Sequence, residues 1–425
     1  MKFFFSMKIS ELHKIFLKFP KVTTDSRNVF KNSLFFALKG ENFNGNEYAT
    51  DAIKKGCKYA IIDEEKYNLN EKYILVDNVL ETLQQLAVYH RETLNIPIIG
   101  ITGSNGKTTS KELITACLST ELNTAYTKGN YNNHIGVPLT LLEINYDHEI
   151  AIIEMGANHQ GEIQFLSEIA KPNFGVITNI GKAHLEGFKD FKGVKKTKKE
   201  LYDYIKKVNG LVFLNNDDDI LNEISKDLDL IKYGKNGDYF GSLIDTSVFC
   251  EVIYEKTIIK SQLIGDYQFY NIMLAIAIAK HFKVKDNSIF KAIKEYKPKN
   301  NRSQIINTDD NLIILDAYNA NPSSMNNMIL SFNKIKKENK ICVLGDMGEL
   351  GKFSEKEHIE IVKLMQKLKI PTFYVGTEFC KVIKNDSFKS TEEFKEYLES
   401  EPIKNSTVLI KGSRSQKLEK LLDLL

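Results

Sequence analysis

The stretch IPIIGITGSNGKTTSKELITACL, residues 96–118, joins an apolar run to an amphipathic run through a turn that contains two glycines. Its first part predicts a buried strand, and TSKELITACL predicts a helix at whose start Thr109 and Glu112 are placed to form a capping box. A strand, a glycine turn and a helix in this order are typical of an anion-binding loop. The spacing differs from the common P-loop, because Gly103 lies only three residues before Gly106, where that pattern needs five.

The turn carries the residue types that phosphate binding needs. Glycines at 103 and 106 allow backbone N–H groups to converge on an anion, and the Lys107 amine can reach terminal phosphates. The Thr108 hydroxyl is a suitable ligand for Mg²⁺. A merely structural turn would not need a lysine followed by two hydroxyls. The predicted nucleotide-binding residues are Gly103, Ser104, Asn105, Gly106, Lys107, Thr108 and Thr109.

The rest of the chain alternates apolar strands with helices, which predicts an α/β fold of three domains. Residues 1–95 predict a small α/β domain. Residues 96–298 predict a mainly parallel, doubly wound sheet, with a buried helix at QFYNIMLAIAIAKHF, which is apolar on nearly all faces. The polar segment KEYKPKNNRSQ, residues 294–304, predicts a linker. Residues 299–425 predict a Rossmann-like α/β domain without a GxGxxG motif.

The composition is that of an ordinary globular protein. Of the 425 residues, 42% are hydrophobic and 27% are charged, and the formal net charge is +3. No apolar run reaches the roughly 18 residues of a membrane span, and the opening MKFFFSMKIS is too short for a signal-peptide core. A charge this small gives no electrostatic reason to expect nucleic-acid binding. We therefore expect a cytoplasmic protein.

Cysteines and arginines are used sparingly. The five cysteines are scattered and never paired as CxxC, so we expect neither a disulfide framework nor a zinc site, but small buried side chains. Only four of the 58 basic residues are arginines. An arginine retained against this bias indicates bidentate binding of phosphate or carboxylate, which lysine cannot copy. Arg27, Arg302 and Arg414 lie in loops beside candidate site segments, whereas Arg91 lies on a predicted helix and is expected to be solvated.

Several polar residues directly follow predicted strands, where ligands bind in open α/β sheets. Glu154 ends the strand in AIIEMG and suits the magnesium of a nucleotide, and His184 follows VITNIG. Asp316 and Asp346 lie just beyond strands of the last third of the chain. The loop KGNYNNHIGVP, residues 128–138, is rich in polar donors. These positions predict one site at the carboxyl edge of the sheets.

Taken in order, seven motifs resemble those of the Mur ligases of peptidoglycan synthesis: TGSNGKTT, GNYNNHIGVP, IEMGANHQGEI, TNIGKAHLEGF, DAYNANPSSM, VLGDMGELG and KGSRSQKLE. The resemblance covers essentially the whole chain, and it accounts for the short loop, because this family has a loop of the TGxNGKT type. It implies an N-terminal domain for a UDP-sugar, a central ATPase domain, and a C-terminal Rossmann-like domain for the incoming amino component.

The resemblance also implies a reaction, in which D-alanyl-D-alanine is joined to UDP-N-acetylmuramoyl-tripeptide at the expense of ATP. ATP phosphorylates the terminal carboxylate of the tripeptide, and the amine of the dipeptide then attacks the acyl phosphate. Lys107 and two Mg²⁺ ions are expected to cancel the repulsion between the two anions. The third peptide residue, diaminopimelate or lysine, stays open, and nothing in the sequence requires more than a monomer.

Family roles transfer residue by residue. The resemblance implies that Thr108 and Glu154 bind the first Mg²⁺ and His184 the second, which a carbamylated lysine supports. In GVKKTKKE, family spacing from the histidine favours Lys198 for this carbamate, with Lys196 as the alternative. The remaining matches are Asn271 at the adenine, Arg302 at the γ-phosphate, Asp316 at the ribose, Asn319 and Asn321 near the acceptor, and Asp25, Ser26, Arg27, Lys39 and Gly40 at the uridine diphosphate.

The chain departs from the family where Tyr267 and Gln268 replace the frequent His-Asn before the Tyr-Asn pair that contains Asn271, which leaves the adenine contacts open. Two alternatives remain. A folylpolyglutamate synthase-like ligase shares the loop and the chemistry, but the DSR motif near the N-terminus and NANP after Asp316 disfavour it. A P-loop nucleotide switch would explain residues 96–215 only and would leave the C-terminal motifs unused.

Overall fold

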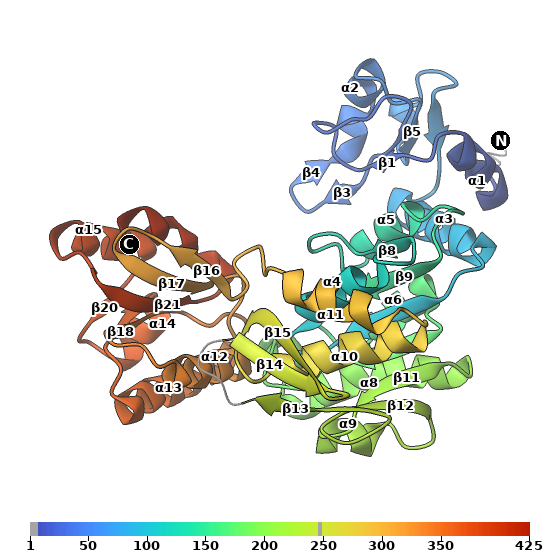
Figure 1. Ribbon diagram of the computed structural model, residues 1–425. Helices are drawn as coiled ribbons and strands as arrows, with labels where there is room; N and C mark the ends of the chain where they lie inside the picture. The colour runs from blue at the N-terminus through green and yellow to red at the C-terminus, as the bar shows by residue number, and fades with distance from the viewer. Residues whose placement is uncertain (1–6, 245–248) are drawn as a thin grey trace.

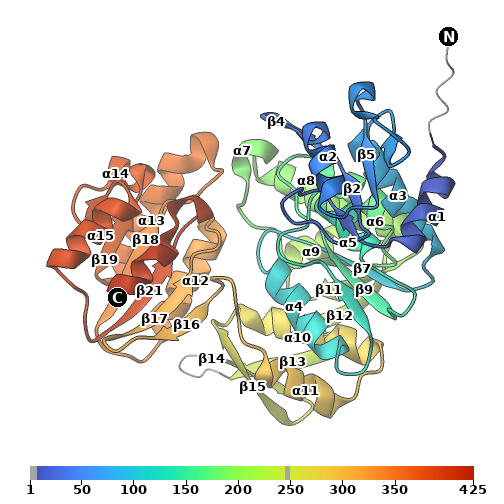
Figure 2. The ribbon, with the colours of Figure 1, turned by 90° about the horizontal axis from the view of Figure 1, so that it is seen from above.

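The computed structural model describes residues 7–244 and 249–425, and its longer strands form three separate sheets. Figure 1 shows these sheets as three bodies, blue at the N-terminus, cyan to yellow in the centre, and orange to red at the C-terminus. The predicted three-domain α/β fold is thereby confirmed. Figure 2, seen from above, shows that helix α7 of the central domain lies beside the C-terminal domain.

The N-terminal domain is built on a parallel four-stranded sheet in the order β1-β2-β5-β6, with a separate β3-β4 hairpin. The apolar runs LFF and YAII form its buried strands. The elements are α1 (Ile9–Lys18), β1 (Val22–Thr23), β2 (Leu34–Phe36), β3 (Lys39–Gly40), β4 (Phe43–Asn44), α2 (Ala49–Lys54), β5 (Tyr59–Ile62), β6 (Tyr73–Leu75) and α3 (Val79–Thr93).

The central domain has a nine-stranded sheet in the order β15-β14-β13-β12-β11-β10-β7-β9-β8. Its strands run parallel from β8 to β13, and β14 and β15 extend it as antiparallel strands. The strands are β7 (Ile98–Thr102), β8 (Thr124–Tyr126), β9 (Ile150–Glu154), β10 (Phe174–Ile177), β11 (Leu211–Asn215), β12 (Asp229–Gly234), β13 (Tyr239–Ile244), β14 (Phe249–Tyr254) and β15 (Thr257–Ile264). The helices are α4 (Lys107–Leu118), α5 (Gly136–Leu142), α6 (Glu162–Ala170), α7 (Leu185–Phe188), α8 (Phe191–Lys207), α9 (Asp219–Ile224), α10 (Gln268–His281) and α11 (Asp286–Glu295).

Helices cover both faces of the central sheet, as the doubly wound prediction requires. Ile99 and Ile152 point into the core formed with α4 and α10, whereas Ile98 and Ile153 point to the opposite core with α6 and α8. Neighbouring residues of one strand serve opposite faces because side chains alternate along a strand. Helix α10, predicted to be buried, has apolar residues on all sides and lies within the first of these cores.

The C-terminal domain carries a six-stranded sheet in the order β16-β17-β21-β18-β19-β20, parallel except for the β16-β17 pair. The predicted linker ends where this sheet begins, since only residues 296–303 separate α11 from β16. The elements are β16 (Gln304–Asn307), β17 (Asn311–Asp316), α12 (Pro322–Lys334), β18 (Lys340–Gly345), α13 (Ser354–Leu368), β19 (Thr372–Val375), α14 (Thr377–Val382), β20 (Ser387–Phe388), α15 (Thr391–Ser400) and β21 (Ser406–Lys411).

Arg91 is buried, so the prediction that it is solvated is wrong. Its guanidinium donates hydrogen bonds to the carbonyl oxygens of Leu94, Ala170 and Lys171, at 2.9 to 3.2 Å, and to the Asn173 side chain at 3.1 Å. The planar group thus ties the end of α3 to the loop between α6 and β10. The arginine is retained here for its fork of donors, which a lysine lacks.

Two buried histidines join α1 to α3. His13 Nε2 lies 3.1 Å from His90 Nδ1, and His90 Nε2 lies 2.7 Å from the Ile144 carbonyl oxygen. Because that carbonyl only accepts, His90 carries its proton on Nε2 and accepts from His13 through Nδ1. Burial lowers the pKa of both imidazoles. The pair therefore links the N-terminal helix to the central domain in its neutral form.

Four of the five cysteines are buried, as predicted, and Cys380 is partly exposed; all five are free thiols. Burial raises the pKa of Cys117 and of Cys250 to about 12. Within the described residues, no helix is long and apolar enough to cross a membrane.

Candidate active site

The glycine loop predicted to bind phosphate, residues 103–106 and called the phosphate loop below, lies between β7 and α4. Gly103 and Gly106 adopt φ angles of +144° and +80°, and a Cβ at Gly103 would lie 2.0 Å from the Thr178 hydroxyl, so only glycine fits there. Lys107 Nζ donates to the Gly103 carbonyl oxygen at 2.6 Å. The predicted capping box is wrong, because α4 begins at Lys107 and Glu112 instead accepts a hydrogen bond from Tyr296.

The phosphate loop is fastened to the segment that follows β10. The Asn105 carbonyl oxygen accepts from Thr178 Oγ1 at 2.6 Å and from Asn179 Nδ2 at 2.9 Å. Ser104 Oγ donates to the Gly181 carbonyl oxygen at 3.0 Å and accepts from the Gly181 N–H at 2.9 Å. These hydrogen bonds shape the loop and fix its position relative to the segment that leads to His184.

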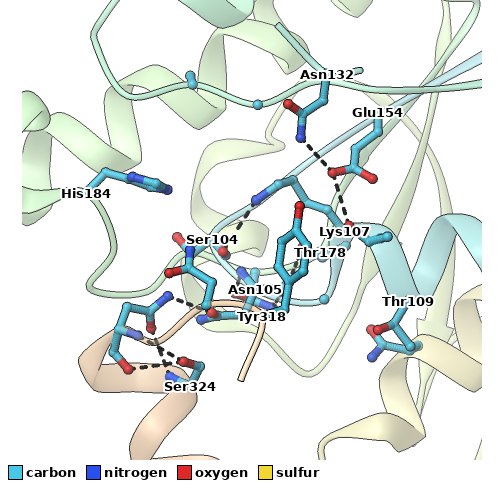
Figure 3. Close-up of a pocket in the computed structure, with 18 of the residues that line it drawn as sticks. Ser104, Asn105, Lys107, Thr109, Asn132, Glu154, Thr178, His184, Tyr318 and Ser324 are labelled. Carbon is cyan, nitrogen blue, oxygen red and sulfur yellow. Dashed lines mark hydrogen bonds between the residues drawn. The ribbon is translucent and has the colours of Figure 1, made fainter. Parts of the chain in front are cut away.

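Glu154 ends β9 beside the loop and is only 1% exposed. Its Oε1 accepts from Asn132 Nδ2 at 2.9 Å and from Thr108 Oγ1 at 3.2 Å. Figure 3 shows Lys107, Asn132 and Glu154 grouped on one side of the cavity, with His184 on the other. Within the described residues, Glu154 Oε2 has no hydrogen-bond partner and lies 3.5 Å from Lys111 Nζ.

His184 lies at the start of α7 with a left-handed backbone, φ +52°. Its Nδ1 contacts the Glu349 carboxylate, which belongs to the C-terminal domain. The contact with His184 lowers the pKa of the Glu349 carboxyl, and the nearby Lys107 charge lowers it further. Burial acts in the opposite direction, but the net pKa is below its ordinary value. A contact between domains thus forms at a residue predicted to bind metal.

The C-terminal domain contributes cations and amides to the same cavity. The Arg302 guanidinium stacks on Tyr318, with its Cζ 3.8 Å from the ring centroid. Asp316 accepts from the Ser303 N–H at 3.0 Å and pairs with the buried Lys411 at 2.6 Å. These contacts fix the polar side chains that face the phosphate loop.

One cavity of about 1050 Å³ collects most of the predicted site residues from the central and C-terminal domains. Of the predicted nucleotide, metal and acceptor positions, it is lined by Ser104, Asn105, Gly106, Lys107, Thr108, Thr109, Glu154, His184, Asn271, Arg302, Asp316, Asn319 and Asn321. The polar loop at 128–138 also contributes to the wall, through Asn132 among others. Arg414 and Asp346 do not line it: Arg414 pairs with Glu419 at 2.9 Å, and Asp346 accepts from two backbone amides of α14.

Three family models match successive parts of the chain: "Mur ligase family, catalytic domain" at residues 18–91, "Mur ligase middle domain" at 101–279, and "Mur ligase, glutamate ligase domain" at 301–414. The UDP-N-acetylmuramoyl-tripeptide--D-alanyl-D-alanine ligase of Bacillus subtilis is 34% identical over 94% of this chain and 92% of its own length. The chain belongs to the Mur ligase family.

Two solved structures are similar to this Mur ligase over nearly its whole length. MurF from Acinetobacter baumannii has a TM-score of 0.85 at 31% identity and covers 95% of this chain and 93% of its own. The MurF ligase from Thermotoga maritima in complex with ADP has a TM-score of 0.83 at 26% identity, with coverage of 95% and 96%. The predicted family and fold class are confirmed.

The predicted uridine-diphosphate residues of this Mur ligase lie in the N-terminal domain, and none of them lines the main cavity. Arg27 binds the Asp25 carboxylate through two nitrogens, at 2.9 and 3.0 Å, and the Ser26 carbonyl accepts from Lys55. On the β3-β4 hairpin, the exposed Lys39, next to Gly40, pairs with Asp63 and Glu64 at 2.9 and 3.1 Å. The predicted uridine-diphosphate residues thus form two polar groups in the N-terminal domain, one around Arg27 and one around Lys39.

The two candidate lysines for a carbamate differ sharply in exposure. Lys198 lies on the inner face of α8 and is 1% exposed, whereas Lys196 faces solvent. The Lys198 amine lies 5.4 Å from the Phe188 ring centroid and forms no ion pair with any residue that the structure describes. Burial, followed by the nearby Lys107 charge, holds the pKa of Lys198 well below its usual value.

The residues around Asn271 show how the unusual Tyr267 and Gln268 are accommodated. Asn271 donates to Gln268 Oε1 at 2.6 Å and accepts from Ser110 Oγ at 2.9 Å. The Tyr267 hydroxyl lies 3.5 Å from Ser303 Oγ. Gln268 therefore orients the amide of Asn271 against the phosphate loop.

Three polar residues of the site were not predicted individually. Lys111 balances the Glu154 charge from inside α4, Lys411 ends β21 against Asp316, and Glu349 reaches His184 from the other domain. A sequence signal exists for Lys111 alone, since it lies one helical turn after Lys107. The other two depend on contacts between distant segments.

Proposed function

We propose that this Mur ligase joins D-alanyl-D-alanine to UDP-N-acetylmuramoyl-tripeptide with cleavage of ATP. The observation that carries the proposal is a single cavity in which the phosphate loop, Glu154 and His184 face Arg302 of the C-terminal domain. The ligase name of the relatives matched over almost the whole chain supports it. A nucleotide switch would have no use for the C-terminal wall of this cavity.

The chemistry requires two anions, the ATP polyphosphate and the tripeptide carboxylate, to meet. In the proposed reaction the carboxylate oxygen attacks the γ-phosphorus and ADP leaves, which gives an acyl phosphate. The dipeptide amine then attacks the acyl carbon, and phosphate leaves from the tetrahedral intermediate while the amine loses its proton. Lys107, Arg302 and the loop amides stabilise the charge, and the fixed loop holds the reacting groups in position.

We assign Thr108 and Glu154 to the first Mg²⁺ because their oxygens suit this ion. The buried Glu154 Oε2 lacks a hydrogen-bond partner among the described residues, which is compatible with a ligand role. Those residues contain no cluster of three or more histidine, cysteine, aspartate or glutamate side chains around one point, so most remaining ligands would be phosphate and water oxygens. Charge neutralisation and polarisation of the transferred phosphoryl group are what Mg²⁺ supplies when bound.

We assign the second Mg²⁺ to His184, with a carbamate on Lys198 in support. The burial of Lys198 and its lack of an anionic partner favour an amine that is neutral and able to react. In that reaction the amine nitrogen bonds to the carbon of CO₂ and loses one proton, so that a carboxylate-like group replaces a potential cation. Exposure of Lys196 disfavours the alternative.

The remaining roles follow the places of the residues in the cavity. We propose Asn271 at the adenine, Arg302 at the γ-phosphate, Asp316 at the ribose, and Asn319 and Asn321 beside the acceptor dipeptide. The uridine diphosphate is proposed to bind Asp25, Ser26, Arg27, Lys39 and Gly40 in the N-terminal domain.

We place the domain boundaries at 95/96 and 298/299, in the segments between the sheets. We propose that the enzyme acts as a monomer. We propose that it acts in the cytoplasm, where nucleotide substrates are available.

Mass spectrometry of the product tests the proposal. Purified protein incubated with UDP-N-acetylmuramoyl-tripeptide, D-alanyl-D-alanine and MgATP should yield the pentapeptide nucleotide, and phosphate release should require both peptide substrates. Phosphate release that ignores the dipeptide would contradict the ligase assignment. Product formed only from folate and glutamate would instead establish the alternative ligase.

A further inference from the structure

The contact between His184 and the C-terminal domain has two points. The Glu349 carboxylate pairs with His184 Nδ1, and the Glu349 carbonyl oxygen accepts from the Glu186 N–H at 3.1 Å. Both contacts lie at the start of α7. This helix follows residues 178–181, which are hydrogen-bonded to the phosphate loop. Glu349 therefore contacts both the His184 ring and the backbone two residues after His184.

The loop that carries Glu349 is held firmly within its own domain. The Asp346 carboxylate accepts from the backbone N–H groups of residues 378–379, both at 2.9 Å. The Met347 N–H donates to the buried His358 Nε2 at 3.1 Å. Glu349 itself has a left-handed backbone, φ +59°. The anchors of its loop thus belong to the C-terminal domain.

The His184 backbone is fixed by the central domain, but its ring has few restraints of its own. Ser104 and Asn105 bind the preceding segment, and the Phe188 ring stands edge-on to the imidazole, with centroids 6.1 Å apart. Among the described residues, Glu349 is the only charged side chain paired with the His184 ring. The orientation of the imidazole thus depends on a residue from the neighbouring domain.

We propose that Glu349 is a positioning residue for His184, delivered when the C-terminal domain docks. A carboxylate on Nδ1 fixes the proton there and leaves Nε2 as the free donor nitrogen of a ligating imidazole. Docking of the domain proposed to bind the dipeptide therefore completes the arrangement of a metal-binding side chain in the ATPase domain. This inference rests on the proposed function, and it gives ATP use a dependence on the docked acceptor domain.

The test compares Glu349→Ala and Glu349→Gln with Lys182→Met. Lys182 pairs with the buried Glu357 across the same domain boundary at 2.7 Å and does not contact His184. Mn²⁺ binding is measured by electron paramagnetic resonance with a non-hydrolysable ATP analogue and D-alanyl-D-alanine at saturation. The saturating ligands enforce docking in each protein, so that a difference between variants reports the metal site.

Glu349→Ala should weaken the second Mn²⁺ at least tenfold, as loss of a partner behind a metal-binding histidine does, and leave the first within about twofold. Glu349→Gln, whose amide oxygen still accepts from Nδ1, should fall between Glu349→Ala and wild type. kcat should fall with the second affinity, while KM for ATP stays within about threefold.

Wild-type affinity for both Mn²⁺ ions in Glu349→Ala would overturn the inference. Equal losses in Glu349→Ala and Lys182→Met would also overturn it, because Glu349 would then act only in docking. Circular dichroism confirms that each variant is folded. A wild-type protein that makes no pentapeptide product refutes the proposed function, whereas an active wild type with an indifferent Glu349→Ala refutes this inference alone.

Discussion

Lys107 carries its charge in surroundings that oppose it. Burial, and the nearby Arg302 charge, lower its pKa, while Glu154 and Glu349 act in the opposite direction. Its amine donates a hydrogen bond to the Gly103 carbonyl oxygen. An amine restrained beside a ready-made loop needs little rearrangement to meet a polyphosphate, so we assign it the largest electrostatic contribution of any single side chain.

Replacement of Lys107 by alanine should lower kcat at least a hundredfold, which corresponds to about 2.7 kcal/mol of transition-state stabilisation. The phosphate-release assay with both peptide substrates measures this effect. Lys206→Ala is the matched control, because Lys206 lies on the surface and pairs with Asp227. A Lys107→Ala protein with near-normal turnover would mean that the loop does not bind the reacting phosphates.

Lys198→Ala should lose most of its activity and regain part of it with added short carboxylates, which can take the place of the missing carbamate. Lys196→Ala should keep wild-type kinetics, because its side chain is exposed. Activity at several formate or acetate concentrations measures the rescue. The assignment fails if Lys196→Ala is the variant that is lost and rescued.

At the scale of elements, helices α1 and α3 attach the N-terminal domain through side chains with specific partners. Arg91 ties α3 to the segment before β10, and the His13–His90 pair ties α1 to α3. Apolar packing alone would allow the helices to slide. Buried hydrogen bonds fix their register because each unpaired group would cost free energy.

Arg91→Ala should destabilise the protein by about 3 kcal/mol, since four acceptors, two of them buried and two partly buried, lose their donor. Arg414→Ala is the matched control and should change stability by less than about 0.5 kcal/mol, because its pair with Glu419 lies at the surface. Urea denaturation followed by circular dichroism compares the two. Equal midpoints would mean that the Arg91 bonds contribute nothing net.

The histidine pair should make stability depend on pH. Both folded-state pKa values lie below the ordinary 6.5, so unfolding takes up protons at acidic pH. The contribution of the pair is thus fully present above about pH 6.5 and declines as the pH falls toward the folded-state values. His13→Gln, which retains a donor for His90, should flatten the change in urea midpoint between pH 7.5 and 5.5. The exposed His159→Gln should leave it unaltered.

The sequence predicts the elements whose signal is local. Uninterrupted apolar runs such as IPIIGIT and STVLIKG are confirmed as β7 and β21. The strands β12 to β15 are not predicted, although the alternation of polar and apolar residues there is typical of strands with one partly exposed face. Arg91 shares the helical face of the buried Leu83 and Ala87, a spacing that already indicates burial.

On the scale of the whole molecule, the central and C-terminal domains meet through polar contacts at the edge of the cavity. Asn321, which caps α12, donates to Asn105 Oδ1 of the phosphate loop at 2.8 Å. Lys182 pairs with the buried Glu357. Such contacts form and break with little loss of apolar packing, which suits a boundary that must open to admit substrates.

The sequence predicts the site residues that belong to one domain, and it does not predict those that depend on contact between two domains. Lys107, Thr108 and Glu154 belong to one sheet edge, and their roles are readable from loop and strand patterns. Glu349 gains its role only when two domains dock, and no periodicity in VLGDMGELG indicates that contact. Contacts across a boundary depend on tertiary geometry, which local sequence does not encode.

Lys182→Met should weaken docking by about 1 kcal/mol, because Glu357 is left buried without its cation. The KM for D-alanyl-D-alanine should rise about fivefold, and small-angle X-ray scattering should show a larger radius of gyration for the free variant. Lys363→Met, which removes an exposed pair within α13, is the control. Identical scattering curves for the two variants would argue against a role for this pair in docking.

The single partly exposed thiol, Cys380, offers a practical handle. With the other four cysteines enclosed, a maleimide fluorophore should attach once per chain, on α14 in the C-terminal domain. Changes in emission or anisotropy would then report the movement of that domain in real time as each substrate is added. No engineered cysteine-free background would be required for the measurement.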